Sequence, residues 1–266
     1  MNISIIGAGN IGGAVARSLS KGSIFKPEDI AISDISKSNL ANIKTFNPSF
    51  KCFNSNRECI KDAEIIIMAV KPNLVEIIAG EISGLLNYDN QIIVSIAAGV
   101  PIEKLRSYFP ANNGKIPTIF RVIPNTAIEV LESFSCIASF NASAEQEELI
   151  VNIFNEMGKS MVVPESLLNS YMSLSSCGIA YAFRYIRAAM VGGVEMGISS
   201  NIARDVVMQT LKGAVALLEA NGTNPEVEID KVTTPGGITI KGLIEMENLN
   251  FSTSVIKGLK ASLLTE

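Results

Sequence analysis

The stretch ISIIGAGNIGGA (Ile3–Ala14) joins a β-rich run to a helix-forming one, and its glycines follow the pattern G-x-G-x-x-G. In that setting Gly7 permits a tight turn, Gly9 lets the backbone approach a pyrophosphate, and Gly12 lets helix and strand pack closely. The amides at the helix start favour a bound phosphate. The stretch therefore predicts a dinucleotide-binding unit rather than a purely structural turn, with cofactor contacts from Gly7, Gly9, Asn10, Ile11 and Gly12.

Around this stretch, short apolar runs alternate with helix-forming segments. We expect strands at 3–6, 30–33, 64–70, 91–97 and 118–123, with two further β-like runs at 135–140 and 160–165. Helices are expected at 12–21, 37–45, 57–63, 102–108 and 144–157. Several strands are continuously apolar, which is typical of parallel strands buried on both faces. The alternation predicts an α/β fold, with a Rossmann-like, doubly wound and mainly parallel sheet.

The character of the chain changes after about residue 165. Helical patterns at 167–196, 201–221 and 238–266 dominate, and strand signals disappear. We therefore predict a dinucleotide-binding domain at 1–164 and an all-helical domain at 165–266.

Composition narrows the possible functions. With 266 residues and 47% apolar content, the chain can bury a large core. A net charge of -4 without a basic block argues against nucleic acid as a partner. The absence of histidine excludes Ser-His-Asp and His-metal chemistry, and no metal site is expected. Because the chain shows no leader pattern and no membrane-length apolar run, we expect a cytoplasmic protein without membrane contact.

Asp34 follows the second expected strand, where Rossmann domains distinguish NAD from NADP. An acidic side chain there accepts hydrogen bonds from a ribose 2'-hydroxyl, which favours NADH. Hydroxyls such as that of Ser33, with nearby Lys37, would instead suit a 2'-phosphate if Asp34 pointed away. A third interpretation is that Asp34 caps the next helix, so the choice between NADH and NADPH stays open.

A second glycine-rich stretch, VTTPGGITI (Val232–Ile240), interrupts the helical region. We expect Thr234 to cap a helix that begins at Pro235, with bare backbone at Gly236 and Gly237. The amides of Gly237, Ile238 and Thr239 would then point at an anion. The alternative is an ordinary turn between helices with a threonine cap.

Further stretches occur in a characteristic order: NRECIKDAEIIIMAVKP (56–72), SIAAGV (95–100), RVIPNT (121–126), LSSCGIAYAF (174–183), GVEMGI (193–198), QTLKGA (209–214) and VTTPGGITIKGL (232–243). With the first glycine loop, they make the chain resemble pyrroline-5-carboxylate reductases over nearly its whole length. The resemblance implies hydride transfer from NADPH or NADH to a cyclic imine carboxylate, giving proline. It also implies a dimer or larger homo-oligomer.

The resemblance assigns site residues as well. Thr239 would bond the ring nitrogen as the catalytic residue, while Thr234, Gly237, Ile238 and Glu165 would bind the substrate. Further cofactor contacts would come from Ser33, Asp34, Asn56, Val70, Lys71, Pro72, Ala97 and Asn125. Local alternatives exist for several of these: a solvated loop lysine at Lys71, a helix cap at Asn56, a simple turn at Asn125 and a helix-terminal carboxylate at Glu165.

The sequence also departs from this family. SCGI (Ser176–Ile179, with Cys177) replaces a usual Gly-Ser-Gly-Pro run, and Arg187 stands where an acidic residue is usual. Two rival functions therefore stay open. One is a β-hydroxyacid dehydrogenase, which needs a general acid-base group such as Lys212, although that residue has the pattern of a surface lysine. The other is a catalytically silent dinucleotide sensor.

Overall fold

The computed structural model describes residues 1–112 and 114–263, and it divides into two compact units. One is built on Met1–Ser176 and the other on Cys177–Ser262. The division therefore follows helix α7 (Glu165–Met172) instead of preceding it at residue 164, as the sequence suggested. The physical reason is that Leu168 and Met172 of α7 are buried in an apolar cluster of the first unit.

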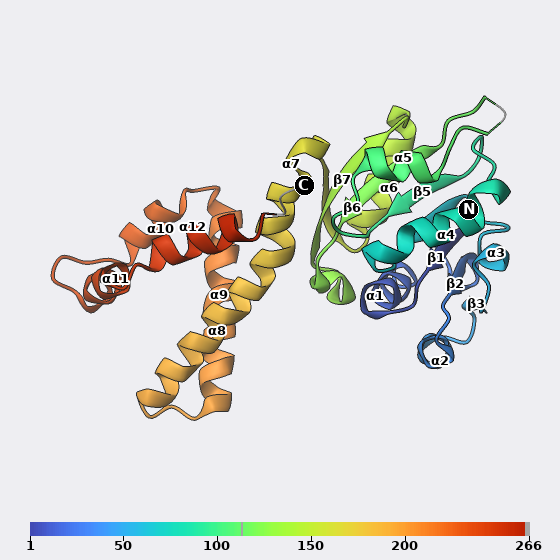
Figure 1. The fold of residues 1–266 in the computed structure, drawn as a ribbon. Helices are drawn as coiled ribbons and strands as arrows, with labels where there is room; N and C mark the ends of the chain where they lie inside the picture. Colours follow the sequence, from blue (N-terminus) through green and yellow to red (C-terminus); the bar gives the residue numbers. More distant parts are fainter. Residues whose placement is uncertain (113, 264–266) are drawn as a thin grey trace. The chain divides into compact units, whose positions relative to one another are not determined.

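The first unit contains an eight-stranded sheet in the order β3-β2-β1-β4-β5-β6-β7-β8 (Figure 1). The strands are β1 (Ile3–Ile6), β2 (Ile30–Ser33), β3 (Lys51–Phe53), β4 (Ile65–Met68), β5 (Ile92–Ser95), β6 (Thr118–Ile123), β7 (Ser133–Phe140) and β8 (Gly158–Val162). All neighbouring strands are parallel except β6 and β7. The doubly wound, mainly parallel sheet is confirmed. The order reverses beside β1, which places the ligand crevice of such sheets at its carboxyl end.

Helices cover both faces of this sheet. They are α1 (Asn10–Leu19), α2 (Lys37–Phe46), α3 (Asn56–Cys59), α4 (Val75–Ile82), α5 (Ile102–Tyr108) and α6 (Ala144–Asn155). Side chains from β1 and β4 alternate between two buried clusters, so Ile5 joins α1, α2 and α6 residues while Ile66 joins α4 and α5 residues. The uninterrupted apolar strands are thus explained by burial on two sides.

One sequence expectation within this unit is wrong, and two elements were not predicted. β3 and α4 carried no recognised signal, and the helix expected at 57–63 ends at Cys59. Beyond Cys59, the Gln91 side-chain amide donates to the carbonyl oxygens of Ile60 (3.2 Å) and Ala63 (2.8 Å). These carbonyls are held in a turn by a residue distant in sequence, which a local pattern does not reveal.

The second unit is helical, as expected, but two of the expected helices are divided and α10 was not expected. They are α8 (Gly178–Glu195), α9 (Ser200–Asn221), α10 (Pro225–Lys231), α11 (Ile238–Asn248) and α12 (Phe251–Ala261). A π-helical turn at Ser173–Cys177 interrupts the helix predicted at 167–196, and Asn250, with a φ of 61°, separates α11 from α12. α8 and α9 approach closely where a Cβ on Gly193 would lie 2.9 Å from the Cβ of Ala203.

No helix among the described residues is long and apolar enough to cross a membrane. Within the same residues, no cluster of three or more His, Cys, Asp or Glu side chains suits a metal ion.

Candidate active site

The glycine loop between β1 and α1 has the packing that its sequence predicted. Gly7 has a φ of +103°, and a Cβ there would lie 2.5 Å from the Ala69 carbonyl oxygen. A Cβ on Gly12 would lie 1.9 Å from the Gly7 carbonyl oxygen. A Cβ on Gly9, by contrast, would meet nothing within 4 Å. Two glycines are therefore required by the fold, whereas the third leaves an open approach to the backbone.

This open position is also the start of α1. Gly9 caps the helix without a side-chain hydrogen bond, and no acidic residue stands in the first turn. Gly9 and Asn10 are exposed. The helix-terminal amides and the positive end of the helix dipole therefore face outward, an arrangement that suits the pyrophosphate of a dinucleotide.

Asp34 lies beside the same loop, and three N–H groups hold its carboxylate. Oδ2 accepts from the Ala8 amide (2.7 Å) and from the Asn39 side chain (3.2 Å), while Oδ1 accepts from the Ser36 amide (2.7 Å). The cap of α2 is Ser36, whose hydroxyl accepts from the Asn39 amide. Asp34 is therefore not the helix cap, and it does not point away from the glycine loop.

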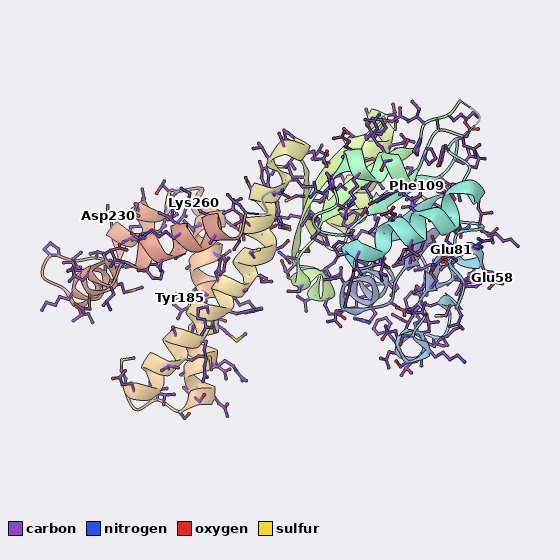
Figure 2. All side chains as sticks on the ribbon, viewed as in Figure 1. Glu58, Glu81, Phe109, Tyr185, Asp230 and Lys260 are labelled. Carbon is purple, nitrogen blue, oxygen red and sulfur yellow. The ribbon has the colours of Figure 1, made fainter. Side chains whose placement is uncertain are left out.

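The expectation for Ser33 is wrong for its side chain. Ser33 is fully buried, and its hydroxyl donates to Asn56 Oδ1 over 2.8 Å. The Asn56 amide nitrogen donates in turn to Glu81 (2.9 Å), a residue labelled in Figure 2. Ser55 caps α3 instead of Asn56. The Ser33 hydroxyl thus holds the Asn56 side chain. The Asn56 amide, which was predicted to contact the cofactor, already has two hydrogen-bond partners, Ser33 and Glu81.

The β4 end places its residues at the carboxyl edge of the sheet. Val70 is half-buried against the glycine loop, since a Cβ on Gly7 would lie 3.0 Å from Val70 Cγ1. Lys71 and Pro72 are exposed and begin a 3-10 turn (Pro72–Leu74). Ala97, after β5, is only 3% exposed and belongs to a buried cluster.

Asn125, after β6, is buried and already hydrogen-bonded. Its Oδ1 caps the 3-10 turn Thr126–Val130 by accepting from the Ala127 amide (3.0 Å), and its Nδ2 donates to the Ser175 carbonyl oxygen (3.3 Å). The same turn is tied to α1, because Arg17 Nε donates to Glu129 over 2.8 Å. This guanidinium lowers the pKa of Glu129. Asn125 therefore caps a turn, which was the structural alternative to its predicted cofactor contact.

Glu165 has partners that the sequence did not suggest. Its Oε1 accepts from the Ile102 amide (2.7 Å) and pairs with Arg121 Nη1 (3.1 Å). Arg121 itself was missed, because the sequence does not show which partners surround a charged side chain within an apolar strand. One carboxylate oxygen is thus used within the first unit, while the Glu165 side chain stays 32% exposed.

In the second unit, Thr234–Gly237 forms a tight turn before α11. The Gly237 amide donates to the Thr234 carbonyl oxygen (2.9 Å), and Gly236 has a φ of +69°. With proline second and this glycine third, the four residues have the pattern of a type II turn. Two expectations are corrected: Gly237, not Thr234, caps the helix, and the Gly237 amide is used within the turn.

The start of α11 nevertheless presents the groups predicted to bind an anion. Gly237 caps the helix without a side-chain hydrogen bond, and no acidic residue lies in the first turn. Ile238 and Thr239 are exposed. A Cβ on Gly237 would lie 2.4 Å from Thr234 Oγ1, so the threonine side chain packs directly over this cap. The amides that begin α11 therefore lack a side-chain cap, as do those that begin α1, and helix starts of this kind suit an anion.

Three charged residues of the helical unit that the sequence analysis considered lie at its surface or in a simple ion pair. Lys231 pairs with Glu228 over 2.7 Å. Arg187 is exposed, and so is Lys212 on α9, as its pattern suggested.

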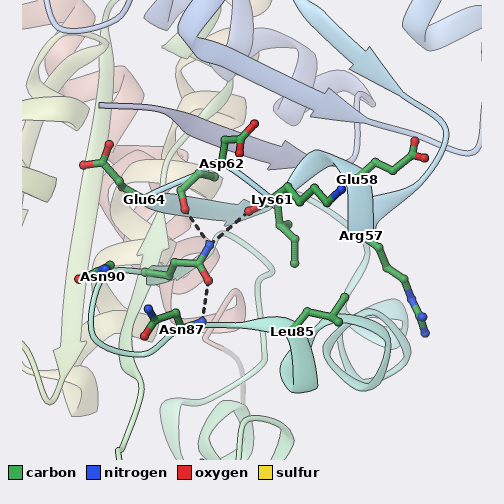
Figure 3. Close-up of a pocket in the computed structure, with 11 residues that line it drawn as sticks. Arg57, Glu58, Lys61, Asp62, Glu64, Leu85, Asn87 and Asn90 are labelled. Atoms are coloured by element: carbon green, nitrogen blue, oxygen red, sulfur yellow. Dashed lines mark hydrogen bonds between the residues drawn. The ribbon is translucent and has the colours of Figure 1, made fainter.

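A separate pocket of about 590 Å³ opens at the opposite edge of the sheet, before β4 and β5 (Figure 3). Its lining mixes both charges, with Arg57 and Lys61 beside Glu58 and Asp62. Gln91 closes it through bonds to surrounding backbone. None of the predicted site residues lines this pocket.

Comparison with known proteins gives independent information. Residues 2–99 match a family model described as NADP oxidoreductase, coenzyme F420-dependent, and residues 165–265 match one described as pyrroline-5-carboxylate reductase dimerisation. A solved pyrroline carboxylate reductase from Plasmodium falciparum with NADP bound is 26% identical, with a TM-score of 0.89 over 99% of this chain and 95% of that one. The match to the dimerisation family begins at residue 165, where the sequence predicted a domain boundary. The division into two compact units lies one helix later, after Ser176.

Two relatives from Dictyostelium discoideum match 98% of the chain. Pyrroline-5-carboxylate reductase 1 is 36% identical, and this chain spans 48% of its length. Pyrroline-5-carboxylate reductase 2 is 34% identical, and the match covers 90% of that protein. Because the 34% identity to reductase 2 extends over nearly the whole length of both chains, this protein belongs to the pyrroline-5-carboxylate reductase family.

Proposed function

We propose that this protein reduces 1-pyrroline-5-carboxylate to L-proline with NADPH or NADH. The observation that carries the proposal is the start of α11, where an exposed Thr239 stands among helix-terminal amides without a side-chain cap. A helix N-terminus of this kind suits a carboxylate, and the neighbouring hydroxyl suits a ring nitrogen.

The first unit supports binding of the dinucleotide. The open backbone at Gly9 and the outward amides of α1 fit a pyrophosphate, while the Asp34 carboxylate fits a ribose hydroxyl. Lys71 is exposed near the same edge and would pair with a phosphate. When bound, reduced nicotinamide supplies a hydride to C5 of the imine.

The side chains around the substrate then have modest chemical tasks. The imine nitrogen is itself basic, so the ring binds as a protonated iminium and needs no strong general acid. Thr239 would hold that nitrogen by a hydrogen bond, and the α11 amides would hold the carboxylate. After transfer of the hydride, the two electrons of the C=N π bond become the nitrogen lone pair of proline. A chain without histidine is sufficient for this reaction.

We further propose that residues 177–262 form the interface of a homodimer. Among their described positions, α8 to α12 bury only Gly193 and Ala203. Large apolar side chains stay exposed, including Leu249 at 75% and Phe183 at 60%. Surfaces of this kind are normally covered by a partner. Light scattering after size exclusion would test the mass, and a monomer at micromolar concentration would contradict the proposal.

The activity is tested by following the absorbance of NADPH or NADH at 340 nm with purified protein. We expect oxidation of the cofactor with 1-pyrroline-5-carboxylate and none with 3-keto acids. Turnover of 3-keto acids with the reduced cofactor, or of 3-hydroxy acids with the oxidised cofactor, would instead identify a β-hydroxyacid dehydrogenase. Cofactor binding without any turnover would identify a sensor.

A further inference from the structure

Arg121 is the one residue with a charged side chain among the described residues that are buried, and it is 0% exposed. It lies on β6, two positions before the strand ends at Ile123. Burying a guanidinium is costly unless it is paired and hydrogen-bonded. The hydrogen-bond partners of Arg121 must therefore offset this cost of burial.

Two of those partners lie one turn apart on α7. Arg121 Nη1 pairs with Glu165 Oε1 over 3.1 Å, and Nη2 donates to Asn169 Oδ1 over 3.3 Å. The same Glu165 oxygen accepts the Ile102 amide of α5 over 2.7 Å. A single carboxylate oxygen thus joins the end of β6 and the starts of α5 and α7.

Two hydrogen bonds link α7 and the turn after it to loops at the carboxyl edge of the sheet, where we propose that the cofactor binds. The segment that carries Ala97 runs from β5 to Ile102, so the Glu165 bond fixes its far end. Asn125 follows β6, and its side chain bonds the Ser175 carbonyl oxygen beyond α7. α7 therefore supports both loops to which the family resemblance assigns the nicotinamide.

We propose that the Arg121–Glu165 pair is a positioning device for the reaction, setting the spacing of the two loops that flank the nicotinamide. This inference rests on the proposed function. It gives Glu165 a role through the protein in place of a contact with substrate. The glycine loop has its own packing and does not depend on the pair, so binding of the adenine half is independent of it.

The test removes both charges together, as Arg121→Met with Glu165→Leu. Replacing a buried ion pair by apolar groups commonly preserves stability, whereas removing one partner leaves an unpaired charge. Because the Ile102 amide also loses its acceptor, we expect the double variant to fold but to unfold at a somewhat lower temperature than the parent. Its kcat should be lowered at least about ten-fold, since small misplacements of reacting groups are costly. Its affinity for ADP-ribose, a probe of the adenine half, should change less than about two-fold.

A second variant and a second readout keep the test decisive. Glu165→Gln keeps an acceptor for the Ile102 amide, so we expect a smaller loss of kcat. Asp89→Asn, which removes an exposed ion pair with Lys115, is the matched control and should behave as the parent. The fluorescence of bound NADPH reports the surroundings of the nicotinamide without turnover, and its change on binding should be reduced in both Glu165 variants.

A folded double variant with the parent kcat and the parent fluorescence change would overturn the inference. Loss of ADP-ribose affinity in step with kcat would also overturn it, because the pair would then support the whole unit. If the double variant does not fold, Glu165→Gln decides between these outcomes. Should the parent fail to reduce the imine, the proposed function fails, and the NADPH fluorescence alone decides the positioning role.

Discussion

The two units of the protein use their apolar residues in opposite ways. In the first, strands such as β1 and β4 are buried along their whole length. In the second, α10, α11 and α12 bury no residue, and Ile238 is 87% exposed. The first unit is therefore stabilised by its own core, whereas the second depends on surfaces that remain to be covered.

The two anion sites differ in the same sense. At α1, packing between Gly7, Gly12 and the β4 end holds the glycine loop in shape. At α11, the turn has open space around Gly236, where a Cβ would meet nothing within 4 Å. Substitutions in the first site should therefore disturb folding, and those in the second should mainly disturb chemistry.

The largest effect is expected for Gly12→Val. Because even a Cβ would lie 1.9 Å from the Gly7 carbonyl oxygen, backbone must move. We expect a loss of about 3 kcal/mol or more in the free energy of unfolding and a Tm lowered by about 10 °C. Thermal unfolding by circular dichroism measures this. Gly236→Ala, strained only through its φ, should cost about 1 kcal/mol. Equal losses for the two variants would remove the contrast between the sites.

Thr239→Val should leave the fold intact and lower kcat for imine reduction by about 100-fold, because the hydrogen bond to the reacting nitrogen is lost. The dissociation constant of NADPH, measured by fluorescence titration, should not change. Thr253→Val, an exposed threonine on α12, is the control. A Thr239 variant with the parent kcat would show that the hydroxyl has no part in the reaction.

Two exposed apolar residues of similar exposure provide a test of the surfaces. Phe183→Asp, on the second unit at 60% exposure, should raise the dimer dissociation constant at least about 30-fold. Ile77→Asp, on α4 of the first unit at 67% exposure, should leave it unchanged. Analytical ultracentrifugation over a range of concentrations distinguishes them. Weakening by Ile77→Asp alone would move the interface to the first unit.

Asp34→Asn should shift the cofactor preference. Removing the negative charge lowers its repulsion of a 2'-phosphate, while the single amide oxygen still accepts from one of the two backbone N–H groups, Ala8 or Ser36. We expect the ratio of kcat/KM for NADPH to that for NADH to rise about ten-fold. Steady-state kinetics with both cofactors gives this ratio. An unchanged ratio would mean that Asp34 only supports the glycine loop through Ala8.

The smallest effect concerns pH. Lys231, together with Thr223 and Asn221, lowers the pKa of Glu228 to about 2. A lowered pKa in the folded state adds stability above the unfolded value, and that stability is lost as pH falls towards 2. Glu228→Gln should therefore lower the urea midpoint slightly at pH 7, with the difference from the parent narrowing below pH 5. A constant difference would place its origin elsewhere.

Local patterns were sufficient for the architecture and for the position of both glycine-rich turns. Strand burial on two faces produces uninterrupted apolar runs, and the glycine spacing reflects steric requirements within a few residues, so Gly7, Gly9 and Gly12 could be assigned roles directly. The helical region after residue 165 was likewise evident from periodicity. In each case, the information lies within one element or the turn that follows it.

Contacts between distant residues decided the rest. The Ser33 hydroxyl is turned inward by Asn56, Glu165 is drawn to Arg121, and α7 joins the first unit through Leu168. At the second anion site, the Gly237 amide closes a turn with the Thr234 carbonyl oxygen instead of starting a helix at Pro235. A residue's type limits which hydrogen bonds it can form, but the partner that it meets depends on how the whole chain packs. The periodicity of the sequence therefore predicted the elements, while the roles of Ser33, Glu165 and Arg121 emerged only in the folded protein.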